Sequence, residues 1–196
     1  MLMGISAPCD HCTPTLSQSA AVLAVGTDGS NPTVVASGIR APVGLTYFPG
    51  TQDLFATMDQ RDDLGAATPG DWLGIVRTGQ RWGFPDCYGQ STGPCATAPK
   101  PVAVLDPHGA VSGLAFVTGD RSSPVGAVVG DAALVAEWAK AEVQLVRLTR
   151  HGTSYTATVA TFLSGLKNPV PVLTEPDGSV LVGDWGSGTV YRVSAR

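Results

Sequence analysis

The sequence predicts an all-β fold, specifically a β-propeller of four-stranded antiparallel blades, and three observations support this. Short runs rich in Val, Leu, Thr and Tyr alternate with turn residues, and no apolar pattern with a 3.6-residue period is sustained. The 24 glycines and 15 prolines punctuate these runs. Strand-like runs recur in groups of four about every 60 residues, which is typical of stacked propeller blades.

One repeated unit accounts for most of the chain. A Pro or Gly corner leads into an apolar strand, a Gly/Asp turn and a second strand, in three copies at 41–59, 111–138 and 168–185. Each copy is followed by a further strand, at 72–78, 142–149 and 189–194. Each is also preceded by one, at 33–38, 101–105 and 155–163.

These strands predict a single partial propeller domain over residues 1–196. Blades are expected at 32–79, 100–150 and 154–196, and residues 1–27 supply the last two strands of a preceding blade. About three and a half blades cannot close into a ring and would expose unpaired strand edges. We therefore expect either a second chain or a missing half to cover these edges.

Composition and charge exclude several classes of partner. The net charge is -4, and the 12 Lys and Arg residues form no run, so neither nucleic acid nor an anionic membrane is expected as a partner. A hydrophobic content of 43% suffices for a buried core, yet no apolar run approaches the ~20 residues of a membrane span. The N-terminal "MLMGISAPCDHC" lacks the basic flank and apolar core of a signal peptide, so we expect no export signal in the chain as written.

The four cysteines form two local pairs, Cys9 with Cys12 and Cys87 with Cys95. Their even number and loop positions favour two short-range disulfides and an oxidising compartment, and free loop thiols remain the alternative. A zinc site is disfavoured because the second pair is too widely spaced for a zinc knuckle. A thioredoxin-like redox pair would need a βαβ context, which the first pair lacks.

The segment from Gly38 to Gly89 carries the sharpest motifs: "GIRAPVGLTYF", "TMDQRDDLG", "PGDWLG" and "GQRWGFPDCYG". They resemble the soluble sugar dehydrogenases that use pyrroloquinoline quinone (PQQ), the glucose/sorbosone dehydrogenase family, including L-sorbosone dehydrogenase-like proteins. The resemblance extends over nearly the whole chain, because "SAPCDHC" is similar to the family's G-S-S-C-N-V-C and "PHGAVSGLAFVTGD" to its H-x-A-P-x-G-L-x-F-Y-T-G-D.

The resemblance implies the C-terminal half of a six-bladed, periplasmic or secreted enzyme that oxidises an aldose or an aldehyde with PQQ and calcium. It implies a catalytic and cofactor-binding role for Arg40, a cofactor-binding role for His108, and calcium binding by Asp59, Asp62 and Asp63. The family's catalytic histidine precedes the segment that matches Met1 to Ser6. The implied fragment therefore lacks the catalytic base.

Residue chemistry supports these roles and also supplies simpler alternatives. Arg40 follows a glycine corner, where its guanidinium could meet a carboxylate or quinone oxygen, or could satisfy carbonyls of the next blade. The three aspartates offer hard oxygen ligands to calcium, or form a solvated turn. His108 could line a central channel, or lie on the surface. The other two histidines, His11 and His151, are expected to be exposed.

Several family positions are occupied by other residues here. The Asn expected after Arg40 is Ala41, the Glu and Asn after the acidic loop are Trp72 and Gly74, and a polar Arg-Pro-x-Asp segment is replaced by residues 168–171. These losses keep open a non-catalytic binding module, completed by self-association or by a partner half. The tryptophans near strand ends are expected to pack between blades, namely Trp72, Trp82, Trp138 and Trp185.

Overall fold

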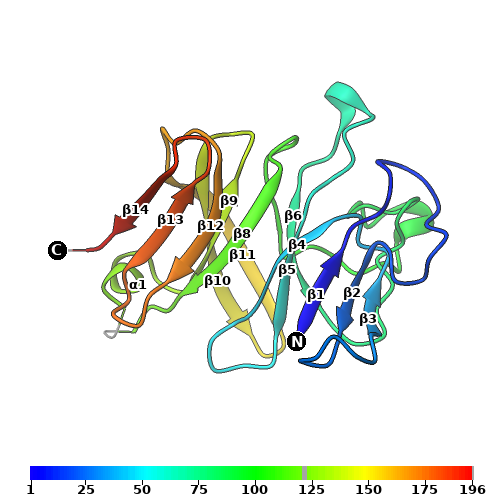
Figure 1. Ribbon diagram of the computed structural model, residues 1–196, viewed down its shortest axis with the longest axis horizontal. Coiled ribbons are helices and arrows are strands. Elements are labelled where there is room, and N and C mark those ends of the chain that lie inside the picture. Colours follow the sequence, from blue (N-terminus) through cyan, green and yellow to red (C-terminus); the bar gives the residue numbers. More distant parts are fainter. Residues whose placement is uncertain (121–122, 196) are drawn as a thin grey trace.

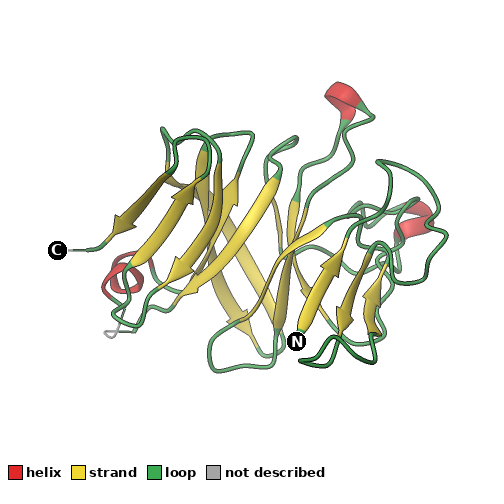
Figure 2. Ribbon diagram, in the orientation of Figure 1, coloured by secondary structure: helices red, strands yellow, loops and turns green. Residues whose placement is uncertain are grey.

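The structure, a computed structural model, describes residues 1–120 and 123–195 and consists of four antiparallel sheets with little helix (Figures 1 and 2). The all-β prediction is therefore confirmed. The first sheet has the order β1–β2–β3, formed by Leu2–Ile5, Ala21–Ala24 and Thr33–Ser37. The second has the order β4–β5–β6–β7, formed by Pro42–Tyr47, Leu54–Met58, Trp72–Val76 and Ala103–Val104.

The other two sheets follow the same plan. The third has the order β8–β9–β10–β11, formed by Val111–Val117, Ala132–Glu137, Glu142–His151 and Ser154–Leu163. The fourth has the order β12–β13–β14, formed by Pro169–Thr174, Val180–Asp184 and Thr189–Val193. Short 3-10 turns lie at Gly65–Ala67 and Gly93–Cys95. Strands consecutive in the chain are thus neighbours within each sheet.

The sheets pack against one another in chain order, as Figure 1 shows from β1 to β14. One core lies between the first and second sheets and contains Val22, Ile39 and Trp72. The second and third sheets share a core with an aromatic cluster, in which Phe55 and Phe116 lie edge to face at 5.1 Å. A third core joins the third and fourth sheets. Each core therefore belongs to two sheets.

The strands β4, β8 and β12 begin with the same irregularity. Register shifts occur between Pro42 and Leu45, between Val111 and Leu114, and between Pro169 and Val172. Glycine at the bulge permits the close approach of the next sheet, because a Cβ on Gly113 would lie 2.3 Å from the carbonyl oxygen of Val170. The repeated Pro or Gly corner of the sequence is thus a bulge that joins neighbouring sheets.

The predicted blade boundaries need a correction. The strands at 33–38, 101–105 and 155–163 were expected to open the blades 32–79, 100–150 and 154–196, but β3, β7 and β11 pair with β2, β6 and β10 and close the preceding sheets. The tight hairpin between β10 and β11 at His151–Ser154 shows the reason, since a short antiparallel connection keeps both strands in one sheet. A repeat pattern alone does not fix where each repeat starts.

A short helix, α1 at Pro124–Val129, lies where the sequence suggested a turn between two strands. Ser123 caps it, because its hydroxyl accepts the Gly126 N–H at 3.0 Å, and Pro124 occupies the first helical position. No helix among residues 1–120 and 123–195 has the length and apolar character needed to cross a membrane.

Candidate functional site

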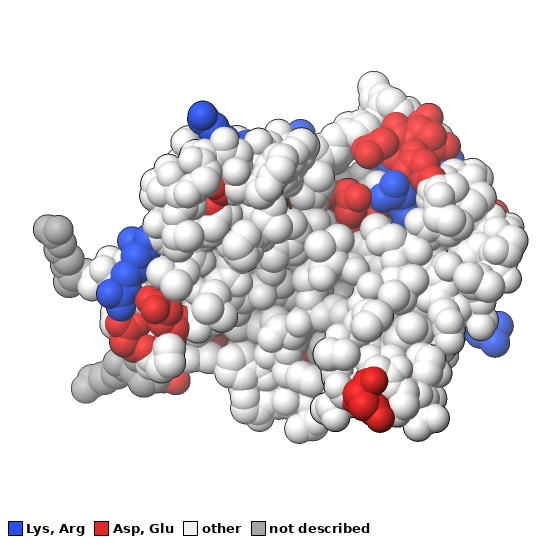
Figure 3. Space-filling model, viewed as in Figure 1, with Lys and Arg blue, Asp and Glu red and all other residues white. Residues whose placement is uncertain are grey.

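The predicted site residues lie on loops at one end of the sheets. Arg40 lies two residues before β4, and the loop 59–71 directly follows β5. Because these strands are antiparallel, the start of one lies beside the end of the other. His108 precedes β8 in the same way. Figure 3 shows carboxylates gathered beside basic side chains at one upper corner of the molecule, over the first two sheets. We call this end of the sheets the loop face.

Arg40 is held by two carboxylates. Its Nη2 lies 2.6 Å from Asp10 Oδ1, and its Nη1 donates to Asp59 Oδ2 at 3.0 Å and to the Asp59 carbonyl at 3.1 Å. The Arg40 side chain is only 16% exposed. Burial raises the pKa of Asp59, and the Arg40 charge opposes that shift. Asp10, from the loop between β1 and β2, was not predicted as a site residue.

His108 connects its own loop to the acidic loop. Its Nδ1 lies 2.5 Å from Asp62 Oδ1, and its Nε2 lies 2.9 Å from the Gly65 carbonyl oxygen. The Gly65 carbonyl and then the Asp62 carboxylate raise the pKa of His108, because both accept a hydrogen bond from the charged imidazolium. His108 therefore links the loop before β8 to the acidic loop that follows β5.

Asp63 pairs with a different cation, Arg61. The guanidinium makes a two-pronged contact, with Nε and Nη2 each 2.6 Å from one Asp63 oxygen, and this contact lowers the pKa of Asp63. The Arg61 guanidinium also lies over the Tyr88 ring, 5.4 Å from its centroid. The loop is thus tied to the "DCYG" segment as well.

These pairings decide whether the loop fits calcium. Asp59, Asp62 and Asp63 face three different partners, namely Arg40, His108 and Arg61, and do not converge on one point. A calcium ion needs 6–8 oxygen ligands around a single centre. The arrangement therefore does not fit calcium, and it does not fit the anionic PQQ either, because the terminal nitrogens of Arg40 already meet carboxylates. Binding of these groups stays a prediction.

The base of the acidic loop rests on a buried carboxylate that the sequence analysis missed. Asp71 accepts the Gln60 N–H at 2.8 Å with one oxygen and the Val111 N–H at 3.0 Å with the other. Burial raises the pKa of Asp71 to about 6. Gln60 in turn donates to the Tyr88 carbonyl at 2.7 Å. The "PGD" turn before β6 was the available signal, since aspartate after Pro-Gly often satisfies loop N–H groups.

A second unpredicted group combines two acids of the third sheet with one from the loop before β8. Asp106, Glu137 and Glu142 place their carboxylate oxygens within 4.8 Å of one another, and they are the acids that converge within the described part of the chain. The Gln144 Nε2, whose NH2 group has two hydrogens to donate, lies within hydrogen-bond distance of all three, at 3.2, 3.4 and 2.7 Å from Asp106, Glu137 and Glu142. Burial, and then the Asp106 charge, raise the pKa of Glu137 to about 7.

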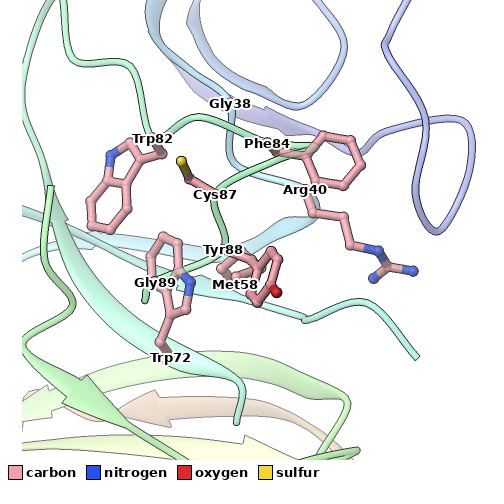
Figure 4. Close-up of a pocket in the computed structure, with 9 residues that line it drawn as sticks. All are labelled: Gly38, Arg40, Met58, Trp72, Trp82, Phe84, Cys87, Tyr88 and Gly89. Carbon is pink, nitrogen blue, oxygen red and sulfur yellow. The ribbon is translucent and has the colours of Figure 1, made fainter. Parts of the chain in front are cut away.

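The tryptophans divide into two classes. Trp72 and Trp82 are buried and stack with ring centroids 4.3 Å apart, as expected for packing residues. They line a narrow pocket with Arg40 and Phe84 (Figure 4), which side chains fill too tightly for water. Trp138 and Trp185 contradict the packing expectation because they are 40% and 72% exposed.

The cysteines and the remaining histidines agree with the sequence. Cys9–Cys12 and Cys87–Cys95 are both disulfide-bonded. His11 and His151 are exposed. The Cys9–Cys12 ring carries Asp10 onto Arg40, so one of the predicted disulfides is part of the loop face.

Comparison with known structures shows a shared fold. The apo form of the soluble aldose sugar dehydrogenase from Escherichia coli is similar, with a TM-score of 0.76 and 20% identity over 100% of this chain and 60% of that chain. The PQQ-bound aldose sugar dehydrogenase from Streptomyces coelicolor gives 0.70 and 18%, over 98% and 57%. The calcium structure of a family AA12 carbohydrate-active enzyme from Trichoderma reesei gives 0.76 and 14%, over 97% and 64%.

Sequence comparison gives the family. A curated protein of Borreliella burgdorferi, described as an uncharacterized protein, is 24% identical over 209 residues, which cover 90% of this chain and 52% of that protein. The chain thus spans about half the length of this relative. The sequence pattern of the family described as Glucose / Sorbosone dehydrogenase matches residues 18–192. Since this match covers most of the residues, the chain belongs to the glucose/sorbosone dehydrogenase family.

Proposed function

We propose that the chain takes part in the oxidation of an aldose or an aldehyde as one portion of a PQQ-dependent dehydrogenase. The observation that carries this proposal is the match of residues 18–192 to the family. Arg40, the cation of its motif, lies on the loop face, and in this chain alone Asp10 and Asp59 cover its terminal nitrogens. A fixed guanidinium is suited to polarise a carbonyl or to bind a carboxylate. PQQ, when bound, would supply the hydride acceptor.

The residues limit what this chain does alone. The cations and acids that the resemblance implies for the site, Arg40, Asp59, Asp62 and His108, are paired within the chain. We therefore expect the isolated chain to oxidise glucose or sorbosone slowly or not at all. The native protein, isolated with any chain that accompanies it, should reduce a dye in the presence of sugar.

The test is a dye-linked assay on the native protein with and without added PQQ and calcium. We expect sugar-dependent dye reduction only with PQQ, and its loss in an Arg40→Gln variant made in the same background. A preparation in which PQQ and calcium add nothing to the rate would contradict the proposal. Arg77→Gln is the matched control, because Arg77 is a 45% exposed arginine that pairs with Asp53 away from the loop face.

A non-catalytic binding module is the second candidate, and the pairing of Arg40, His108 and Arg61 favours it. In this case the chain would assemble with itself or with a partner half through its open edges. Within the described residues, β14 pairs on one side only, with β13, and β1 only with β2. Light scattering of the purified chain separates the candidates, because a monomer at all concentrations argues against self-assembly.

We further propose that the chain works in the periplasm or outside the cell. The two disulfides support this, since such bonds persist in oxidising compartments. Thiol titration of protein released from the periplasm should find no free thiol before denaturation and reduction. Four titratable thiols in freshly isolated protein would contradict this location.

A further inference from the structure

Asp10 occupies the place on Arg40 where an anionic ligand would bind. A guanidinium binds carboxylates and carbonyl oxygens through its terminal nitrogens. In Arg40, Nη2 faces Asp10 at 2.6 Å and Nη1 faces Asp59 at 3.0 Å. The remaining nitrogen, Nε, is buried and has no hydrogen-bond partner within the described residues. The directions from which a ligand would approach are thus covered by two carboxylates of the chain itself.

Asp10 is fixed in this position from several sides. The Cys9–Cys12 disulfide closes a small ring around it. The backbone N–H of Ala7 donates to the Arg40 carbonyl at 2.6 Å, so the two segments also meet through their main chains. The Asp62 N–H donates to both carboxylate oxygens of Asp10, at 2.9 and 3.1 Å. Asp10 therefore links Arg40 to the acidic loop rather than resting loosely on the surface.

The charges around Arg40 disfavour the binding of an anionic ligand. Asp10 and Asp59 together carry two negative charges against the single positive charge of Arg40. Asp62, on the same loop, adds another carboxylate. A ligand carboxylate would therefore meet repulsion at Arg40, whose side chain is largely buried, so that screening by solvent is weak.

We propose that Asp10 is a specificity-determining residue that acts as a built-in counter-ion of Arg40 and excludes anionic ligands from the loop face. A carboxylate-bearing or quinone ligand binds there only when the Asp10 contact is broken or its charge is removed. Asp10→Asn removes the charge while keeping the size and an oxygen that can accept the Asp62 N–H.

The experiment measures ligand binding rather than turnover. Two probes are used in calcium-free buffer: citrate, a simple tricarboxylate, followed by titration calorimetry, and PQQ, followed by equilibrium dialysis. We expect Asp10→Asn to bind both at least about 10-fold more tightly than the wild-type chain. Only the choice of PQQ depends on the proposed function. A gain for citrate without a gain for PQQ would support the counter-ion role and count against the cofactor.

A matched control separates the local contact from net charge. Asp177→Asn removes the same charge from the turn between β12 and β13, where Asp177 pairs with Arg192, and should leave both affinities unchanged. The double variant Asp10→Asn, Arg40→Gln should lose the gain. Equal tightening in Asp10→Asn and Asp177→Asn, or no change in either, would overturn the proposal.

If Asp10→Asn does not fold, ligand binding to the wild-type chain still tests the proposal. For the isolated wild-type chain, in which Asp10 covers Arg40, the proposal expects weak binding of citrate and PQQ, with Kd above about 1 mM, that does not change in Arg40→Gln. Micromolar binding to the wild-type chain that Arg40→Gln abolishes would show that Asp10 does not exclude anions. Circular dichroism of each variant shows which measurement applies.

Discussion

At the residue scale, burial rather than sequence neighbourhood sets the chemistry of the acidic side chains. Glu137 ends β9 with a fully buried side chain, and Asp106 and Glu142 approach its carboxylate. Charging a carboxyl group in this setting costs desolvation and repulsion, so the protonated form is favoured in the folded chain. A carboxyl of this kind makes the stability of the fold depend on pH.

The direction of that dependence follows from the pKa of Glu137, which rises from 4.5 to about 7 on folding. The contribution to stability is fully present below about pH 4.5 and is lost as pH rises through about 7. Glu137→Gln should remove this part of the dependence, worth on the order of 2 kcal/mol between about pH 5 and about pH 8. Asp71, with a pKa of about 6, adds a slope of the same sign in both proteins.

Urea unfolding at the two pH values measures this effect. The free energy of unfolding of the wild-type chain should fall more steeply with pH than that of Glu137→Gln. Glu175→Gln makes the same chemical change in the turn that follows β12 and should behave as the wild-type chain. Parallel slopes for all three proteins would show that Glu137 is already charged at low pH.

At the element scale, the bulges in β4, β8 and β12 bring neighbouring sheets into contact. The carbonyl of Val170 lies so close to Gly113 that a Cβ there would need backbone movement in β12. Gly113→Ala should therefore destabilise the fold by about 3 kcal/mol, as overpacking against rigid backbone does. Thermal unfolding checks this.

Gly119→Ala is the matched control for this change. The nearest atom to its Cβ, the Cα of Gly130, would lie 3.2 Å away, so a small local shift accommodates the methyl group. We expect a cost below about 1 kcal/mol. Similar losses of stability in both variants would mean that the backbones of β8 and β12 can move apart at little cost.

The limits of sequence-based prediction are also clearest at this scale. Apolar alternation and turn residues identified nearly every strand, because local chemistry decides strand formation. They did not identify which sheet β3, β7 and β11 join, because a repeat has no intrinsic starting point and hydrogen-bond pairing selects one. The helix α1 was missed although Ser123 and Pro124 are a cap and a first-turn residue, because the repeat pattern predicted only a turn between two strands there.

The candidate site shows the same division. The motifs located Arg40, Asp59, Asp62, Asp63 and His108, and the structure brings them to one face. Their partners were beyond sequence reasoning, because Asp10 reaches Arg40 from a loop 30 residues away in the chain only after two sheets have packed. The three aspartates of the acidic loop have a sequence pattern that suits calcium, but in the structure each forms an ion pair within the chain.

At the scale of the whole molecule, the three cores make each sheet depend on its neighbours. A sheet at either end shares a core with one neighbour, whereas the second and third sheets share cores on both faces. Hydrogen exchange should therefore be slowest in β5 and β9, whose side chains are all buried, and fast in β14, where four of five residues are exposed. Uniform exchange across the sheets would contradict this gradient.

The Cys9–Cys12 ring also affects how firmly the first sheet is held to the second. It lies on the first sheet, and the Asp10 contact fastens that sheet to Arg40 and to the acidic loop of the second sheet. An end sheet with only one core to share is the part of a linear array that frays first. Asp10, which governs ligand binding at Arg40, thus also stabilises the first sheet against local unfolding. A ligand that displaces Asp10 would therefore destabilise the first sheet as it binds.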